Sequence, residues 1–460
     1  MRTYPRAIRD GIALLTVALA LALAIGCSAP SSHDSLWQEP RALGTAVPSP
    51  LPPTDPALED ISTAVETPAS LTIDDAIRLA LTANPALAAA GWDVRGAEAA
   101  AWQAGLRPNP ELALEAEEML GSGELSGFDA FAASVVVEYE IALGGKRGKR
   151  VLAAEAQGRL AAWDYEATRL DVFTGARKAF LAAVIAQEQQ ALGTRTLELA
   201  RGTLDTVTAQ GVAGRSAAVE RTRAEMTVAE AESTLRSSRN AVEASYKALA
   251  AHWGATEVAF ERVDGSLPDL VEPPSAEAAR DGLAEAPALA RWADEFAALD
   301  AAVAAADAEG SPDIGVGIGG QYFRETKERS FLVELGVPLP LFDTNQGGVA
   351  EARAAEAKGR AEARQAAAAT RAAFEQAYAD LLSAYQEGVT ARDELMPRAQ
   401  ELLDKTMIGY KAGKFRYLEA LIAQEELVET EQAYLQARAT YALALADIER
   451  LIARELQDTE

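Results

Sequence analysis

The sequence predicts a mainly α-helical chain with a transmembrane β-barrel portion, built as two tandem helix–β-hairpin–helix repeats with four strands per chain. Three observations lead to this class. Alanine-rich sequence runs without proline between Pro110 and Pro268, which favours very long helices. Landmarks of the first half recur in the second half at a nearly constant offset. Four short segments have the length of strands, and three of them alternate clearly between apolar and polar residues, with Leu332 breaking the pattern in the fourth.

Composition excludes several classes of function. The 460 residues include 43 basic and 69 acidic side chains, a net charge of −26, which argues against a nucleic-acid partner. One cysteine and two histidines leave no disulfide framework, no cysteine-ligated zinc site and little histidine chemistry. The glycine-rich segment 315–320 precedes a predicted strand rather than a helix, so it is no dinucleotide loop. We therefore expect no catalytic site, resident metal or cofactor.

The N-terminus has the pattern of an export signal over residues 1–26. Arginines precede the apolar run 12–25, whose fourteen residues are fewer than the roughly 20 that a membrane-spanning helix needs. The run ends at Cys27 in a sequence that resembles the bacterial lipobox, with Ala24 in place of the usual leucine. We expect Cys27 to carry lipid; the alternative is an ordinary signal cleaved nearby. Residues 27–70 then form a lipid-anchored, proline-rich linker.

The remainder of the chain consists of two copies of one repeat unit. Three pairs of segments match in the same order, displaced by 202, 202 and 199 residues: 84–88 with 286–290, 110–112 with 312–314, and 212–215 with 411–414. A tandem duplication explains this order and spacing. It predicts the following division: first repeat 71–253, equatorial linker 254–274, second repeat 275–456 and a tail at 457–460.

The first repeat opens with a helix whose N-cap is Thr72, followed by acidic residues in the first turn. The helix is interrupted at Asn84-Pro85, because proline disfavours helical backbone in the residue before it. Strands are expected at about 111–119 and 131–141. A very long helix from 146 to 209 and a return helix to about 253 complete the repeat.

The second repeat is expected to follow the same plan with a helix at 276–309 and strands at about 313–323 and 330–339. A long helix at 344–410 follows, and Pro397 should kink or cap it. The return helix 415–456 carries apolar residues at intervals of seven, which predicts left-handed coiled-coil packing or, alternatively, an amphipathic bundle helix.

The strand segments indicate a membrane-embedded sheet. Each has about 9–11 residues, the length of a tilted transmembrane strand, with apolar side chains on one face and glutamate or glycine on the other. Four strands cannot close a barrel, and lipid does not tolerate an open edge. Three chains with twelve strands would solve this problem. The alternative is a soluble sheet with one wet face.

Several motifs together resemble the TolC-type outer membrane efflux proteins, and two of them resemble the heavy-metal branch that contains CzcC and CusC. They are 71–76 with 84–87, 105–112, 144–147, 337–347 and 410–413 with 418–421. The resemblance implies a homotrimer with a 12-stranded barrel in outer membrane lipid and a periplasmic α-helical barrel. It also implies docking to a periplasmic adaptor (membrane fusion) protein and an inner-membrane pump of the RND type.

The expected function is the passive conduction of substrate, with metal cations favoured, from pump and adaptor to the exterior. Efflux of drugs or solvents, or type I secretion, is the alternative within the same family. A periplasmic coiled-coil scaffold or adaptor is a remoter alternative, because it does not explain four strand segments at fixed places in a duplication.

Charged residues at two places are the candidate functional residues. Carboxylates on the strands cannot face lipid, so we expect them to line the pore, where rings of negative charge favour cations or only keep the lumen wet. They are Glu111, Glu115, Glu117, Glu138, Glu140 and Glu334. The gate is expected at the periplasmic tip, with Glu419 at the first position of an aspartate pair often found in the family and Ile422 at the second.

The same tip is basic. Lys411, Lys414, Arg416 and Arg215 could contact the adaptor or form ion pairs of the gate, or they are simply solvated.

Overall fold

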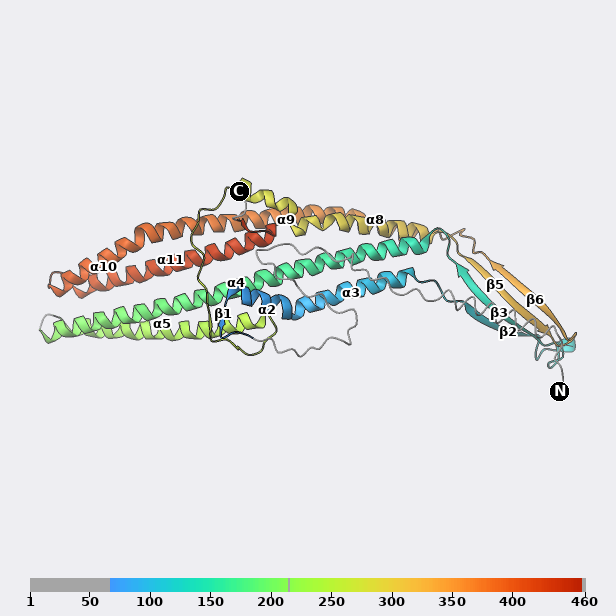
Figure 1. Ribbon diagram of the computed structural model, residues 1–460, viewed down its shortest axis with the longest axis horizontal. Coiled ribbons are helices and arrows are strands. Elements are labelled where there is room, and N and C mark those ends of the chain that lie inside the picture. The colour runs from blue at the N-terminus through green and yellow to red at the C-terminus, as the bar shows by residue number, and fades with distance from the viewer. Residues whose placement is uncertain (1–66, 214–215, 457–460) are drawn as a thin grey trace.

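The computed structural model describes residues 67–213 and 216–456 of the chain. Long helices run side by side along an elongated molecule, and a four-stranded sheet extends from one end (Figure 1). The opposite end is formed by two helical hairpins. The expectations for the export signal, for Cys27, for most of the linker and for Arg215 lie outside the described residues.

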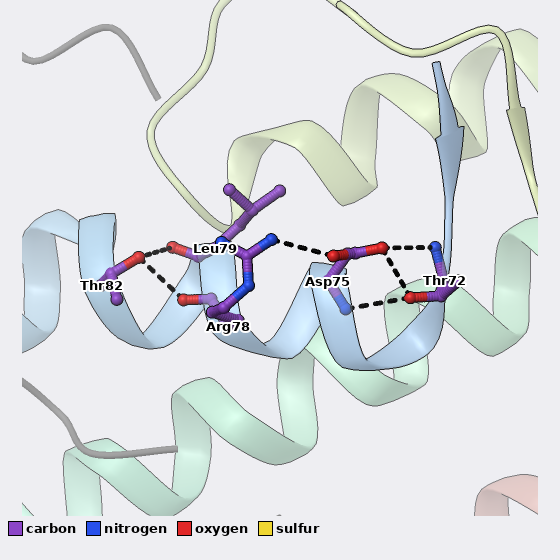
Figure 2. A network of polar contacts seen from close by, with 5 residues as sticks. All are labelled: Thr72, Asp75, Arg78, Leu79 and Thr82. Atoms are coloured by element: carbon purple, nitrogen blue, oxygen red, sulfur yellow. Dashed lines mark hydrogen bonds and ion pairs between the residues drawn. The ribbon is translucent and has the colours of Figure 1, made fainter. Parts of the chain in front are cut away.

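The first repeat begins as the sequence predicts. After β1 (Ser70–Leu71), the hydroxyl of Thr72 accepts the backbone N–H of Asp75 at 3.2 Å and donates to the Asp75 carboxylate at 2.7 Å (Figure 2). This capping box starts α2 (Ile73–Ala83). The side chain of Asn84 then caps α3 (Pro85–Gly105), accepting two backbone N–H groups.

The long helix α4 (Lys146–Val212) turns back into α5 (Ala218–Ala251) and forms the first hairpin. The chain then crosses the middle of the molecule and adds β4 (Arg262–Val263) beside β1 in parallel. Buried apolar residues from β1, α2, α4, α5, the linker segment and α11 form a common core there, among them Leu71, Phe180 and Leu267.

The second repeat opens differently from the first. The helix expected over 276–309 is divided into α6 (Ala276–Asp281), a 3₁₀ turn η4 (Gly282–Glu285), α7 (Pro287–Ala290) and α8 (Trp292–Glu309). Pro287 holds the preceding alanine in extended backbone, which ends the turn. The match between 84–88 and 286–290 thus marks a break in both repeats.

The second long helix contains the irregularity expected from its proline. Helix α9 (Gln346–Thr390) passes through a π-helical turn η5 (Ala391–Leu395) into α10 (Met396–Lys411). The N–H of Met396 bonds to the carbonyl of Ala391, five residues back. Pro397 has no N–H and its ring collides with the carbonyl four residues earlier, so a widened turn before it relieves the conflict.

Helix α11 (Tyr417–Ile452) returns along α10 and α9 and also packs against α4. It packs on α9 through the buried cluster around Phe374, Leu381 and Ile448, and it joins the two repeats through polar contacts with α4, such as that of Lys178 with Asp447. Within the described ranges, no helix is long and apolar enough to cross a membrane.

The sheet is antiparallel with the order β2–β3–β5–β6: β2 (Glu111–Glu117), β3 (Ala132–Ile141), β5 (Ile314–Phe323) and β6 (Glu328–Gly336). Strand β2 is shorter than expected because Glu118 has a positive φ of 54° and turns the chain. Strand β6 is displaced toward the hairpin from the expected 330–339 and ends before Pro338, which cannot donate to a ladder.

Candidate functional site

One row of residues crosses the sheet from edge to edge. Glu111 lies opposite Glu138, Glu138 opposite Gly317, and Gly317 opposite Glu334. Directly opposed residues share a face of the sheet, so three carboxylates stand in line on one face with a glycine between two of them. The sequence predicted these glutamates singly. Their alignment depends on strand order and register, which only the structure supplies.

The two faces of the sheet differ sharply in chemistry. The glutamate face also carries Glu115, whose carboxylate accepts from the hydroxyl of Ser134 at 3.4 Å, and Glu117 and Glu140 at alternate positions. All six predicted lining glutamates are solvent-exposed in the single chain. The other face carries large exposed apolar side chains: Leu112, Leu114, Val135, Val137, Ile318, Phe331, Val333 and Leu335. That face suits lipid, and the acidic face suits water.

Glycines in β5 leave room for this arrangement. A Cβ built on Gly317 would lie 3.1 Å from the Cβ of Glu334 and 3.1 Å from a methyl group of Val136. At Gly319 it would collide with the backbone carbonyl of Val135. The absence of a side chain at Gly317 therefore lets the Glu334 side chain approach β5, and its absence at Gly319 lets the backbone of β3 approach.

The base of the sheet forms a groove of ≈ 840 Å³ where it meets the helices. Seven carboxylates line it: Glu111, Glu138, Glu140, Glu309, Asp313, Glu334 and Asp343. The lining contains one basic side chain, Lys146. Such an excess of acidic groups makes the potential of the groove negative and raises the local concentration of cations.

Lys146 holds together parts of the two repeats at this groove. Its buried ammonium lies 2.7 Å from a carboxylate oxygen of Asp313 and 3.8 Å from Glu309. The same Asp313 carboxylate accepts the backbone N–H of Leu143 at 3.1 Å. Both Gly144 and Gly145 have positive φ, and a side chain on Gly144 would collide with Ser311. This contact was not predicted from the sequence, although the repeat landmark at 312–314 contains Asp313.

The opposite end of the molecule gathers the predicted tip residues. Lys411, Lys414 and Arg416 are exposed around the turn between α10 and α11. The amide of Gln210 on α4 donates to the carbonyl of Lys411 at 3.2 Å and links the two hairpins. Behind the turn, the rings of Tyr410 and Tyr417 are buried with their centroids 6.1 Å apart.

Glu419 has a local structural contact in this arrangement. Its carboxylate accepts the backbone N–H of Arg416 at 2.6 Å and so caps the start of α11. The side chain remains exposed. In the part of the chain described, no cluster of three or more histidine, cysteine, aspartate or glutamate side chains is arranged to hold a metal ion.

A two-faced sheet at one end of a long helical bundle defines a channel subunit that is inserted in a membrane by strands rather than by helices. The chain belongs to the outer membrane efflux protein family, which it matches over residues 76–255 and 279–454. Members of this family are channels of the outer membrane rather than enzymes.

Relatives and solved structures agree with this assignment. The cobalt-zinc-cadmium resistance protein CzcC of Cupriavidus metallidurans is 28% identical over 384 residues, covering 84% of this chain and 90% of that protein. The nickel and cobalt resistance protein CnrC of the same organism is 30% identical over 295 residues, covering 62% and 68%. The fold is similar to that of CusC, with a TM-score of 0.70 at 17% identity over 88% of this chain and 99% of that chain. A membrane protein from Pseudomonas aeruginosa gives 0.72 at 19% identity over 84% and 92%.

Proposed function

We propose that this protein is the outer membrane channel of a tripartite efflux system that exports metal cations. The observation that carries the proposal is the row Glu111–Glu138–Gly317–Glu334 on the polar face of a sheet whose other face is apolar. In a closed barrel this row would place nine carboxylates in the lumen of three chains. Rings of carboxylate favour cations over anions.

The substrate assignment is supported by the relatives. CzcC and CnrC are resistance proteins for cobalt, zinc and cadmium and for nickel and cobalt. The acidic groove above the helices fits a cationic substrate, and the dispersed carboxylates fit passage rather than tight binding. Selection among metals is then the task of the pump, because the channel lining offers charge without a coordination cage.

The same geometry supports the proposed assembly. Four strands leave two open edges, β2 and β6, so we infer a homotrimer that closes a twelve-stranded barrel. The helices continue this barrel into the periplasm. The exposed basic residues Lys411, Lys414 and Arg416 at the far tip are the expected contact for a periplasmic adaptor, which in turn meets an inner-membrane RND pump.

The N-terminal segment supplies the membrane anchor in this proposal. The export signal 1–26 is removed, and Cys27 becomes a lipidated N-terminus attached through the linker 27–70 to the outer membrane. Mass spectrometry of the mature protein should find acyl groups on Cys27. An unmodified N-terminus at another residue would refute the anchor and leave the channel proposal intact.

The decisive experiment removes the gene and scores growth in zinc, cobalt, cadmium and nickel beside organic toxicants. We expect metal tolerance to fall and to return with the wild-type gene. A complementing variant with Glu111, Glu138 and Glu334 all replaced by Gln should be inserted normally and restore less tolerance. Lost tolerance to drugs with unchanged tolerance to metals would instead favour drug or solvent efflux.

A further inference from the structure

The sheet ends in two strands whose outer edges have no strand beside them in the described chain. Beyond β6 lies the segment 337–342, which is not part of a strand in the single chain and in which Leu339 and Leu341 are 75% and 74% exposed. Given the channel proposed above, we infer that this segment pairs with β2 of a second copy in a register set by the internal duplication. In that register Leu339 lies opposite Leu114 of the partner subunit.

The register is derived from the pairing inside one chain, because the β3–β5 contact joins the first repeat to the second. The residue numbers of each β3–β5 pair add to 455, from Ala132 with Phe323 to Ile141 with Ile314. In the same way, β2–β3 pairs add to 249 and β5–β6 pairs to 651. With an offset of 202 between β2 and β5, the offset between β3 and β6 is 200.

The start of each long helix supports the offset of 200 independently. Gly145 is the N-cap of α4 and Asn345 is the N-cap of α9. Both adopt the left-handed conformation, with φ of 71° and 58°. Asparagine is among the few residues other than glycine that adopt this conformation readily. The residue before each long helix therefore has the same left-handed backbone conformation in both repeats.

Adding 200 to a β3 residue gives its counterpart in or beyond β6, and subtracting 202 from a β5 residue gives its counterpart in β2. The β3–β5 pairs therefore predict pairs between one copy and the next whose residue numbers add to 453. They are Val337 with Ala116, Leu339 with Leu114, and Leu341 with Leu112. The side chains of β2 in these pairs belong to the apolar face of the sheet. In the single chain Leu339 lines the acidic groove, whereas the proposed pairing would extend β6 and its alternation from Leu335, which places the three residues of the segment on the apolar face too. A slip of one residue would bring glutamates level with this lipid-facing row, which is strongly unfavourable.

The two prolines of the segment fit this register. At the hairpin end of β3–β5, the N–H of Arg324 donates to the carbonyl of Phe131 at 2.9 Å. Odd-numbered residues of β3 therefore direct their backbone N–H and C=O groups toward β5. Because the offset of 200 is even, odd-numbered residues of β6 and of the segment after it direct theirs toward the partner subunit. Pro338 and Pro340 then occupy even positions, where the ladder to the partner needs no N–H. In the single chain the N–H of Leu341 bonds to the Leu339 carbonyl at 2.8 Å, and the partner strand would replace this bond.

A polar contact at the junction is carried over in the same way. Inside the chain, Asp313 accepts the N–H of Leu143 and the ammonium of Lys146. The corresponding groups across the contact between copies are Glu111 of the partner subunit, the N–H of Asp343 and the side-chain amide of Gln346. Gln346 already lies at this junction, with its amide donating to the Phe342 carbonyl at 3.1 Å. Glu111 thus completes the acidic row and also binds the neighbouring copy.

Cysteine pairs test the register in native membranes. The pair Leu339→Cys with Leu114→Cys should give covalent dimers and trimers on a non-reducing gel after mild oxidation, because opposed Cα atoms lie about 5.5 Å apart. The pairs Leu339→Cys with Leu112→Cys and Leu339→Cys with Ala116→Cys lie on the same face but are displaced by two residues. We expect at least a tenfold lower yield from them. Single variants measure any background from Cys27 and from misfolding.

Native mass spectrometry of the unoxidised variants separates the two proposals. A trimer with the expected pair cross-linked supports the register. If the protein is trimeric but a displaced pair reacts best, or no pair reacts, the register is wrong and the channel proposal stands. A protein that remains monomeric in detergent and in native membranes would refute the channel itself.

Discussion

At the scale of single residues, two polar contacts show how position decides what a charge contributes. Asp75 belongs to an exposed helix start, where it accepts from the hydroxyl of Thr72 and from Arg78 at 2.8 Å (Figure 2). Glu449 lies inside the bundle on α11, where it is 5% exposed and pairs with Arg177 of α4. The first carboxylate is easy to solvate without its partners, whereas the second is not.

Replacing Thr72 by Ala should cost about 1 kcal/mol of unfolding free energy, because an N–H of the first turn loses its acceptor. The matched control is Thr82→Ala. The hydroxyl of Thr82 bonds only to the helix carbonyls of Arg78 and Leu79, so its loss should change stability by less than about 0.5 kcal/mol. Thermal unfolding followed by circular dichroism measures both; equal effects would contradict the capping role.

The Asp75 contacts also predict a pH dependence. Hydrogen bonds from Thr72 and Arg78 lower the pKa of Asp75 below its ordinary value. The ionised form is therefore favoured in the folded chain, and its contribution to stability is present above the unfolded pKa of about 3.9. That contribution is lost as the pH falls through the folded pKa. The melting temperatures of wild type and Asp75→Asn should differ at pH 7 and converge at low pH.

Removing Arg177 should be far more costly than removing its neighbour Lys178. Arg177→Met leaves Glu449 buried without its cation, a loss of about 3 kcal/mol, at the lower end for buried pairs because Arg177 is partly exposed. Lys178→Met breaks a half-exposed pair with Asp447, whose contribution is at most about 1 kcal/mol. Chemical denaturation measures both, and similar losses would show that burial is not the cause.

The Arg177→Met defect should be smaller in acid. Burial raises the pKa of Glu449, although Arg177 opposes the shift. A raised carboxyl pKa means that stability is greatest below the unfolded pKa of about 4.3 and is lost as pH rises through the folded pKa. Without Arg177 the pKa rises further. Lowering the pH through that range should therefore restore part of the stability that the variant loses at pH 7.

At the scale of elements, proline determines where a regular helix is interrupted, and glycine determines where neighbouring strands can approach each other closely. The π-helical turn before Pro397 interrupts the helix that would otherwise run from α9 into α10. The glycines of β5 allow backbone and side chains from both neighbouring strands to come near. Each of these two features can be altered by a single substitution that leaves the charge of the protein unchanged.

Pro397→Ala restores an N–H that can bond to the carbonyl of residue 393. We expect the widened turn to tighten toward regular α-helix and the amides of 391–399 to exchange with deuterium more slowly. Exchange along the central part of α11 should stay unchanged and serves as the internal control. Faster exchange in 391–399 would show that the proline is not the cause of the π-helical turn.

Gly319→Ala should prevent normal pairing of β3 with β5, because its Cβ would overlap the Val135 carbonyl. Gly320→Ala is the control: its Cβ would lie 3.6 Å from the Ser330 carbonyl, an ordinary contact. We expect the first variant to be depleted at least tenfold from the outer membrane fraction. The second should be present near the wild-type level. Equal amounts would contradict the packing that the structure shows.

At the scale of the whole molecule, we expect the charge on the sheet to determine which ions pass. Replacing Glu111, Glu138 and Glu334 by Gln removes three negative charges from each chain along one row. The cation preference of the open channel, measured from reversal potentials in planar bilayers, should fall in 0.1 M salt. The effect should shrink in 1 M salt, where screening acts over about 3 Å instead of about 10 Å.

The matched control changes the net charge equally but outside the sheet. Glu257, Glu261 and Glu272 are exposed in the segment between the repeats, and replacing all three by Gln should leave selectivity unchanged. If both triple variants lose the same preference, net charge rather than the lining is responsible. If neither does, the selective ring lies elsewhere, and Glu419 and the basic tip become the next residues to test.

The parts predicted from sequence are those that depend on neighbours along the chain. The capping box at Thr72 is one example, since the hydroxyl and the N–H that it accepts are three residues apart. The four strands are another example, because the alternation of residues assigns their two faces whichever strands pair. Their ends differ from the prediction at two places: β2 ends before Glu118 and β6 ends before Pro338. The duplication predicted the position of the β-hairpin in each repeat. The division of the helix expected over 276–309 into short pieces was not predicted, because the residue pattern alone does not distinguish the 3₁₀ turn before Ala286 and the short helix after it from a regular helix.

Only the tertiary structure decided which distant residues meet. Lys146 and Asp313 are 167 residues apart, and Arg177 and Glu449 are 272 apart. The alignment of Glu111, Glu138 and Glu334 depends on three strand registers at once. Such contacts depend on the packing of α4 against α8 and α11 and on the pairing of β3 with β5. Burial and backbone pairing summed over many residues determine that packing, so no local pattern encodes it.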